Sequence, residues 1–509
     1  MTTPTRTPAL ELTPVRVGWR GWAALAVLML PVLLVSVDNT VLNFALPAIS
    51  EALTPSGTAL LWMIDIYPLI LAGLLVAMGS LGDRIGRRKL LLVGSAGFGL
   101  VSVLAAFAPS IELLIGARAA LGFFGAMLMP STLSLIRSIF RDRGQRRLAI
   151  AIWASAFAAG SALGPIIGGI LLEHLWWGSV FLLAVPVLLP LFALAPFLVP
   201  ESRDPSPGKL DLVSIALSLV TMLPVVYGIK HLATEGWDAV GLAAIGLGLV
   251  AGALFVRRQR RLETPMLDLA LFRQPAFSGA VVINLLSVIA FVGGLFFVSQ
   301  HLQLVLGLSP LTAGFTLVPG LITMIIAGLL VVPVAARVRP SIVVPAALVL
   351  SAVGYGAIGL TGGAVDAAGI TICFVLLGLG IGAAETVSNE LILASAPVDK
   401  AGAASAVSET AYELGAVLGT ATLGSILTAS YRNAVLLPDG LTADQHSAAA
   451  ETLGGAVHVA GELPSDAASA LLESARHAFD SGVGLSAWLG CGLIVTAAIV
   501  ALLAFRSVR

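Results

Sequence analysis

The chain carries the stretch Gly79-Ser-Leu-Gly-Asp83-Arg84-Ile-Gly86-Arg87-Arg88-Lys89 between two long apolar runs, 59–80 and 89–108. Each run has about the 20 residues that an α-helix needs to cross the hydrocarbon core of a bilayer. The glycines allow the chain to turn back tightly, and Asp83 can form ion pairs with the arginines beside it. The stretch therefore predicts an ion-paired latch in a short loop between two membrane-spanning helices.

The composition agrees with a membrane protein. The chain has 509 residues, of which 58% are hydrophobic and 11% charged, whereas a soluble domain carries about 25% charged residues. The excess apolar surface must therefore face lipid, and the 54 glycines and 27 prolines are typical of membrane helices that pack closely and bend. The two cysteines, Cys373 and Cys491, each lie in an apolar run, which excludes a disulfide framework and a cysteine-based zinc site.

Fourteen segments are long and apolar enough to span a membrane. They lie near 22–49, 59–80, 89–108, 112–136, 147–171, 178–199, 211–229, 239–256, 276–298, 310–334, 341–360, 368–393, 402–429 and 484–505. An even number of spans places both termini on the same side. With alternating loops, 24 of the 28 basic residues fall on the side of the termini, and only Lys230, Arg432 and Arg476 fall on the other, with Arg118 inside a span. The positive-inside rule then places both termini in the cytoplasm of a cell-membrane protein.

One long segment, 431–482, is predicted to lie outside the membrane. Leu463-Pro-Ser-Asp466 has the pattern of a turn followed by a helix start. We expect a helical hairpin here, which is either a solvated surface loop or a functional lid.

The loop that begins at Gly79 resembles the signature loop of the major facilitator superfamily. Further motifs resemble those of its fourteen-helix drug:proton antiporters, the QacA-, SmvA- and LfrA-type pumps, and the resemblance covers essentially the whole chain. These motifs are Ser36-Val-Asp38-Asn39-Thr40-Val-Leu-Asn43-Phe-Ala45-Leu46-Pro47, then Trp62, Asp65, Tyr67 and Leu69, then Arg118-Ala-Ala-Leu-Gly122-Phe-Phe-Gly125, then Gly160-Ser-Ala-Leu-Gly164-Pro165-Ile-Ile-Gly168-Gly169, and Ser405-Ala-Val-Ser-Glu409-Thr-Ala-Tyr412-Glu413-Leu-Gly415.

The resemblance implies an all-α integral membrane protein with the major facilitator fold. A cytoplasmic N-terminus (1–21) would precede an N-terminal six-helix bundle (22–200), two inserted helices (201–262), and a C-terminal six-helix bundle (263–509) that includes the outer hairpin. Substrate would bind between the bundles near the middle of the membrane, and rocking of the bundles would alternate access to it.

Five ionisable residues inside the spans are candidates for coupling transport to protons. Such groups are costly in a bilayer and therefore usually functional. Asp38, Asp65 and Arg118 are expected in one layer in the outer half of the first bundle, whereas Glu409 and Glu413 lie nearer the cytoplasm, one helical turn apart. A carboxylate in such a cavity can exchange a proton for a cationic substrate, because both cannot be held favourably at once. We assign Asp38 as the leading proton site with Arg118 tuning it, and the two glutamates as substrate-side or secondary proton sites.

Structural roles are the alternatives for these residues. Asp38 would then only accept hydrogen bonds from neighbours such as Asn39 and Thr40, and Asp65 would be a structural partner of Arg118. Structural roles are also the alternative for Glu413 and the reading favoured for Glu385.

Aromatic and glycine residues complete the candidate sites. Aromatic rings can stack on flat or cationic ligands, although packing is the commoner role. The candidates for substrate binding besides the two glutamates are Trp62, Tyr67, Phe157, Tyr412 and Asn43. The fifth-helix glycines permit close packing and bending, with or without a role in gating. The gating candidates are Gly79, Asp83, Arg84, Gly86, Arg87, Arg88, Gly160, Gly164, Pro165, Gly168 and Gly169.

Three functions fit the pattern. The first is a proton-coupled multidrug efflux antiporter for lipophilic, often cationic compounds such as quaternary ammonium compounds, dyes and antibiotics. The second is a dedicated exporter of one natural product, and the third is a non-transporting sensor on a transporter fold. An enzyme is not expected, and an ATP-driven pump is excluded because Gly208-Lys209 is followed by Leu210 rather than by the Ser or Thr of a Walker loop. We expect a monomer that uses the proton gradient as its energy source, contacts membrane lipids, and has no cofactor, metal site or nucleic-acid partner.

Overall fold

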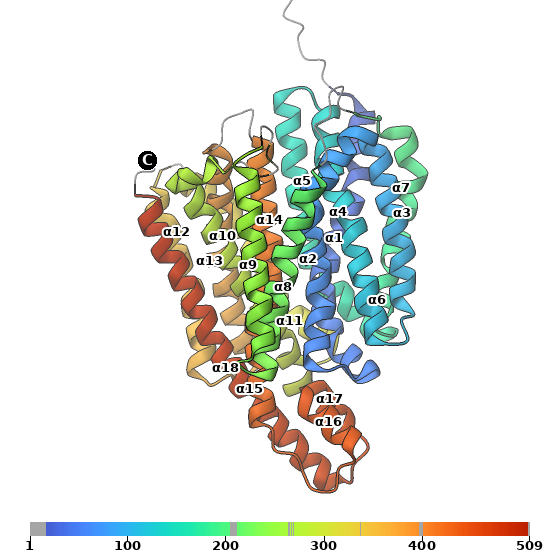
Figure 1. The fold of residues 1–509 in the computed structure, drawn as a ribbon, viewed down its shortest axis with the longest axis vertical. Helices are drawn as coiled ribbons and strands as arrows, with labels where there is room; N and C mark the ends of the chain where they lie inside the picture. The colour runs from blue at the N-terminus through green and yellow to red at the C-terminus, as the bar shows by residue number, and fades with distance from the viewer. Residues whose placement is uncertain are drawn as a thin grey trace, which may run out of the picture.

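The computed structural model describes residues 17–203, 211–262, 265, 267, 269–335, 337–395 and 401–506. All regular secondary structure in this part of the chain is helical (Figure 1). Fourteen of its helical segments are long and apolar enough to cross a membrane, which confirms the predicted number of spans.

The described part of the first half of the chain forms nine helices. They are α1 (Trp19–Leu53), α2 (Gly57–Ile85), α3 (Arg87–Ala106), α4 (Ile111–Ile139), α5 (Arg143–His174), α6 (Ser179–Leu182), α7 (Ala184–Leu198), α8 (Leu212–Glu235) and α9 (Ala239–Gln259). The short α6 and α7 together make one span. Side-chain caps fix several starts: the Ser56 hydroxyl accepts from the N–H of Ala59 at the start of α2, and Asp211 caps α8 in the same way.

Among the residues that the structure describes, the second half contains nine further α-helices and three short helical turns. They are η1 (Leu271–Arg273), α10 (Pro275–Gln300), η2 (His301–Val305), α11 (Pro310–Ala335), α12 (Pro340–Leu360), α13 (Ala367–Ala394), α14 (Ala401–Gly419), η4 (Thr420–Gly424), α15 (Ser425–Ala434), α16 (Ala443–Glu451), α17 (Leu453–Ala460) and α18 (Ser465–Ala504). The turn η4 is a π-helical segment that joins α14 to α15 within one span. Such segments often occur at functional sites in helical proteins.

The helices form two bundles with a helix pair beside them. Helices α1 to α7 pack on one another, as do α10 to α15 with α18. Helices α8 and α9 pack mainly on each other, and α8 also contacts α2 of the first bundle and η4 and α15 of the second. Figure 1 shows this pair lying across the line where the two bundles meet.

A helical hairpin projects from one end of the molecule, as the sequence predicts for 431–482 (Figure 1). Helix α17 packs against α16 and against α18, which begins at Ser465 rather than near residue 484. The first part of α18, residues 465–483, carries several polar residues, so the apolar pattern alone did not show that the helix continues into the last span. The described chain starts and ends at the opposite end of the molecule from this hairpin (Figure 1).

Candidate functional site

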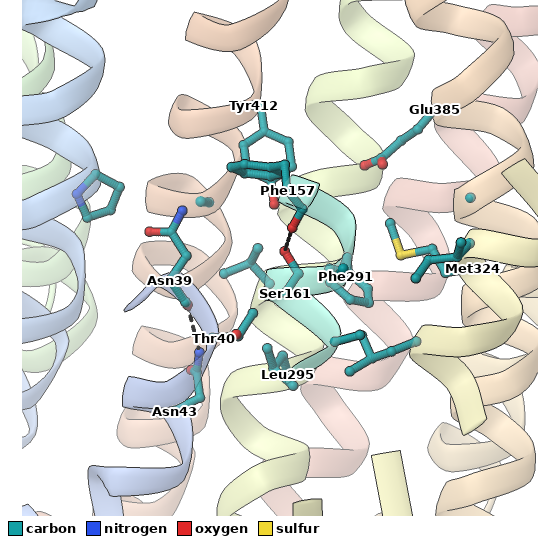
Figure 2. Close-up of a pocket in the computed structure, with 18 of the residues that line it drawn as sticks. Asn39, Thr40, Asn43, Phe157, Ser161, Phe291, Leu295, Met324, Glu385 and Tyr412 are labelled. Carbon is teal, nitrogen blue, oxygen red and sulfur yellow. Dashed lines mark hydrogen bonds between the residues drawn. The ribbon is translucent and has the colours of Figure 1, made fainter. Parts of the chain in front are cut away.

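A cavity of about 500 Å³ lies between the two bundles (Figure 2). Its wall is mostly apolar and includes Phe291, Leu295 and Met324. Among the described residues, the charged side chains in this wall are Asp65, Arg118 and Glu385. A concave, apolar space with a few convergent polar groups is typical of a small-molecule site.

Asp38 and Arg118 form a buried ion pair between α1 and α4. Arg118 Nη1 lies 2.7 Å from Asp38 Oδ2, and the Arg118 side chain is only 2% exposed. Its Nε donates to the Met63 carbonyl at 3.3 Å, and its guanidinium carbon lies 4.4 Å from the centre of the Tyr67 ring. Arg118 belongs to the cavity wall, whereas Asp38 lies behind it. This geometry agrees with the prediction that Arg118 acts on Asp38, while the Thr40 hydroxyl points to helix carbonyls instead.

Asp65 and Lys230 form a second buried pair, between α2 and α8. Lys230 Nζ lies 2.9 Å from Asp65 Oδ2, and both side chains are fully buried. The assignment of Lys230 to an outer loop is therefore wrong, because α8 continues to Glu235 instead of ending near residue 229. The carboxylate neutralises the ammonium, so this lysine does not have to reach water at the membrane surface. The pairing also shows that Asp65 is not the structural partner of Arg118.

The second bundle supplies three carboxylates of a different kind. Glu385 lines the cavity, and its Oε1 is buried without a hydrogen-bond partner among the described residues. Glu413 is 6% exposed, and its Oε2 is likewise buried without a hydrogen-bond partner among the described residues. Glu409 stands one turn away on α14, within electrostatic range of Arg137 on α4. Glu409 and Glu413 lie beside the cavity rather than in its wall.

The predicted substrate-binding aromatics divide into two groups. Phe157 of α5 and Tyr412 of α14 line the cavity from opposite bundles, with ring centres 6.0 Å apart in an edge-to-face arrangement (Figure 2). Asn43 also lines it. Tyr67 and Trp62 are not part of this wall. The Tyr67 ring packs against the Arg118 guanidinium, and the Trp62 ring centre lies 4.3 Å from Lys230 Nζ.

The glycine motif of α5 packs against both bundles. A Cβ at Gly160 would lie 2.8 Å from the Ser36 Cβ, and one at Gly168 would lie 2.8 Å from Val41. Gly164, between them, lies directly against Thr40 of the same helix α1. The opposite side of α5 meets the second bundle, since a Cβ at Gly169 would lie 2.5 Å from the Leu311 Cα. Pro165 presents its carbonyl to Gly314 of α11 in the same contact. These residues therefore combine fixed packing on α1 with the contact between bundles.

The loop between α2 and α3 contains the predicted ion pair. Arg87 Nη2 lies 2.7 Å from Asp83 Oδ1, one turn earlier. Gly86 has a φ of +110°, a conformation that disfavours any residue with a side chain. A Cβ at Gly86 would also lie 2.8 Å from the carboxylate of Glu201.

Glu201 is the partner that the sequence did not reveal in this loop. Its two oxygens accept the backbone N–H groups of Arg88 and Lys89 at the start of α3, at 3.0 and 3.2 Å. A carboxylate at a helix N-terminus is favourable because it satisfies free N–H groups and opposes the helix dipole. Arg88 Nη1 in turn donates to the Val199 carbonyl at 3.0 Å, so the loop is tied to the end of α7. Gly79 lies one to two turns earlier, where a Cβ would meet Pro130 at 3.6 Å, an ordinary contact.

The two bundles are also joined at the hairpin end of the molecule. Glu451 Oε2 accepts the backbone N–H of Gly57 at the start of α2, at 3.2 Å, and Arg432 lies 3.7 Å from the same carboxylate. A Cβ at Gly454 would lie 2.7 Å from Ser50 near the end of α1. With the contact between α5 and α11, these interactions hold the two bundles together at the hairpin end of the molecule.

The comparisons with known proteins agree with this architecture. A sequence profile of the Major Facilitator Superfamily matches residues 28–420. The chain is 60% identical to the "Multidrug efflux pump LfrA" of Mycolicibacterium smegmatis over 500 residues, which is 98% of each chain. It is 37% identical to the "Methyl viologen resistance protein SmvA" of Salmonella typhimurium, over 91% of this chain and 93% of the relative. It is 34% identical to the "Tetracenomycin C resistance and export protein" of Streptomyces glaucescens, over 95% and 92%.

Solved structures support the fold. A bacterial homologue of the human lysosomal transporter Spinster, in an inward-facing and occupied conformation, superposes with a TM-score of 0.63, covering 96% of this chain and 97% of that one at 17% identity. A transporter of the POT family with a bound peptide conjugate gives a TM-score of 0.60, over 93% and 96%, at 11% identity. At these identities the likeness concerns the arrangement of helices alone.

Proposed function

Because the chain belongs to the Major Facilitator Superfamily, we propose that it exports lipophilic, often cationic drugs across a membrane in exchange for protons. It is a multi-pass membrane transporter and not an enzyme. The cavity between the bundles is the observation that carries the proposal. It combines an apolar wall for a lipophilic body with the Glu385 carboxylate for a positive charge.

Protons enter this proposal through the buried carboxylates. Glu385 and Glu413 each hold a buried oxygen without a hydrogen-bond partner in the described part of the chain. A proton or a cationic drug would satisfy such a group, and the two compete for it, which is the requirement for antiport. Asp38 stays in the scheme as the candidate whose charge Arg118 already balances. Glu409, one turn from Glu413, is placed to receive the proton on its way out of the protein.

The direction of transport rests on the distribution of basic residues. The positive-inside rule supports placing both termini in the cytoplasm, so that the hairpin of α16, α17 and the first part of α18 lies outside. In this orientation the contacts at the hairpin end close the cavity to the exterior. Export then requires those contacts, including that of Gly169 with Leu311, to open as the bundles rock.

A dedicated exporter of one compound is the second candidate. The tetracenomycin relative has a name of this kind, whereas the relative at 60% identity is named as a multidrug pump. The mixed wall of Phe157, Tyr412 and flexible Met324 favours broad recognition, since it offers few directional hydrogen bonds.

Transport by purified protein tests the proposal. The protein is reconstituted in liposomes with an imposed pH gradient, and uptake of methyl viologen, a quaternary ammonium compound, a cationic dye and a neutral antibiotic is measured. We expect gradient-driven uptake of several cations, abolished by a protonophore. Uptake of one compound only would favour the dedicated exporter, and no gradient-dependent uptake of any compound would overturn proton-driven drug export.

A further inference from the structure

The helix α8 packs against both bundles along the line where they meet, which we call the seam. The Ser218 hydroxyl donates to the Gly73 carbonyl of α2 at 3.3 Å, and Gly73 lies directly against Leu219. Further along the helix, Val226 of α8 joins Leu69 of α2 and Ala421 of η4 in a small buried cluster, separate from the main core. One helix of the inserted pair therefore touches both moving halves of the transporter at one place.

Lys230 of α8 brings a positive charge to this seam. A buried ammonium is costly unless a close partner neutralises it, and Asp65 provides that partner at 2.9 Å. Thr420 of η4 lines the same cavity as Asp65, and η4 packs on both α2 and α8. The first bundle, the second bundle and the inserted helix thus meet around Asp65.

The orientation of this pair is what matters for transport. Asp65 belongs to the wall of the cavity, whereas Lys230 lies behind it, outside the described lining. A cation in the cavity would therefore meet a carboxylate whose charge is already balanced from the other side. The Asp38–Arg118 pair has the reverse orientation, with the cation in the wall and the carboxylate behind.

We propose that Lys230 is a resident counter-cation that limits how much positive charge the cavity accepts, and so makes the inserted helix a determinant of substrate selectivity. The inference rests on the proposed export of cationic drugs. With Lys230 in place, Glu385 is the carboxylate in the wall that is free to hold a drug cation, which suits a single positive charge. If the Lys230 ammonium is removed, Asp65 becomes a second free carboxylate in the wall. Compounds with two positive charges should then bind more tightly.

Two probes of matched shape and different charge test this selectivity. Methyl viologen is a flat two-ring dication, and N-methylphenylpyridinium is a monocation of the same two-ring form. Equilibrium binding of both is measured on the purified full-length protein, together with their uptake into liposomes. The quantity of interest is the ratio of dication affinity to monocation affinity, which a general loss of folded protein does not change.

The variant Lys230→Met keeps most of the side-chain length and removes the charge. We expect the ratio to rise on the order of tenfold, which corresponds to about 1.4 kcal/mol of differential binding. Asp65→Asn should lower the ratio, because it leaves the Lys230 cation next to the cavity without its carboxylate. An unchanged ratio in Lys230→Met, or a fall, would overturn the proposal. If Lys230→Met cannot be recovered in folded form, Asp65→Asn decides, and an unchanged ratio there overturns it equally.

A matched control uses the ion pair at the other end of the inserted helices. Arg258 of α9 lies 2.8 Å from Asp211 at the start of α8, and neither residue lines the cavity. The double variant Asp211→Asn/Arg258→Met removes a charge pair from the same two helices, and we expect the ratio to stay at the wild-type value. A change as large as that of Lys230→Met would mean that loosening of the helix pair, and not cavity charge, sets selectivity. Failure of the wild-type protein to bind or move either probe would instead refute the proposed function.

Discussion

The two bundles treat buried charge differently. In the first, Asp38 and Asp65 each lie within 2.9 Å of a cation. In the second, Glu385 and Glu413 form no ion pair among the described residues, and each keeps a buried oxygen without a partner. The negative charge of a paired carboxylate is already neutralised by its cation. An isolated buried carboxylate needs a proton or a cationic ligand to be neutralised. The comparison indicates that the first bundle holds fixed charge and the second holds exchangeable charge.

Replacement of Glu413 by Gln should have the largest effect. The amide cannot take up or release a proton, so we expect uptake driven by a pH gradient to fall to background while drug binding persists. Drug-induced proton release from the purified protein is the direct measurement. Glu390→Gln is the matched control, because this exposed residue on α13 already reaches solvent and should tolerate the change. Normal proton release from both Glu413→Gln and Glu385→Gln would break the comparison.

Replacement of Asp38 by Asn should act mainly on stability. It leaves Arg118 buried without its counter-ion, a change that costs about 3–5 kcal/mol when one partner of a buried pair is removed. We expect a clearly lower melting temperature in detergent, partly restored by combining Asp38→Asn with Arg118→Met. If Asp38→Asn is stable but releases no protons on drug binding, the paired carboxylate is the proton site after all, as the sequence-based ranking had it.

Replacement of Gly164 by Ala tests the packing of α5 on α1 beside Asp38, the α1 member of the Asp38–Arg118 pair. The added methyl group meets Thr40 directly, two residues from Asp38, and overpacking of this kind costs about 1–3 kcal/mol. Export at normal expression should drop accordingly. Gly116→Ala on α4 is the control, since a Cβ there has nothing within 4 Å, and it should export normally. Equal export by the two variants would remove Gly164 from the gating residues.

The Asp211–Arg258 pair should give the smallest effect, because it is partly exposed. The hydrogen bond from Arg258 lowers the pKa of Asp211 from its ordinary 3.8 to about 2. The folded state thus favours the ionised carboxylate, so the stabilisation is present above about pH 4 and is lost as the pH falls toward 2. Asp211→Asn keeps the helix cap and should cost less than about 1 kcal/mol at pH 7. The melting temperatures of variant and wild type should converge at low pH. A difference that stays constant with pH would refute the stabilising role of the ionised Asp211 carboxylate.

The sequence predicted the fold well because length and hydropathy are enough to define a membrane span. The tight turn at Gly86 and its ion pair were also predictable, because the pattern places glycines next to an Asp and several Arg residues. The sequence also predicted the helix start near Ser465, but not that this helix continues without a break into the last span, because residues 465–483 carry polar groups before the apolar run.

The site was less predictable, because its geometry depends on partners far apart in the chain. Asp38 and Arg118 were correctly expected to share a layer, but the pairing of Asp65 with Lys230 joins residues that no local pattern connects. Lys230 stands at the end of an apolar run, where a lysine usually reaches the membrane surface. The sequence favours a structural role for Glu385, although its position in the cavity wall places it where a ligand would bind. A charged residue within one helical turn of a predicted span end, such as Lys230, can belong either to the loop or to the buried part of the helix.

The length of α18 gives the molecule a lever. Its 40 residues extend about 60 Å at 1.5 Å per residue, roughly twice the hydrocarbon thickness of a bilayer. When the second bundle tilts, the far end of this rod sweeps through a much larger arc than the helices around the cavity. That end carries the short helices that hold Gly57 and Ser50 of the first bundle. In the proposed rocking motion, a small rotation at the cavity would therefore become a larger separation at the hairpin end, where the contacts of Glu451 with Gly57 and of Gly454 with Ser50 would have to break.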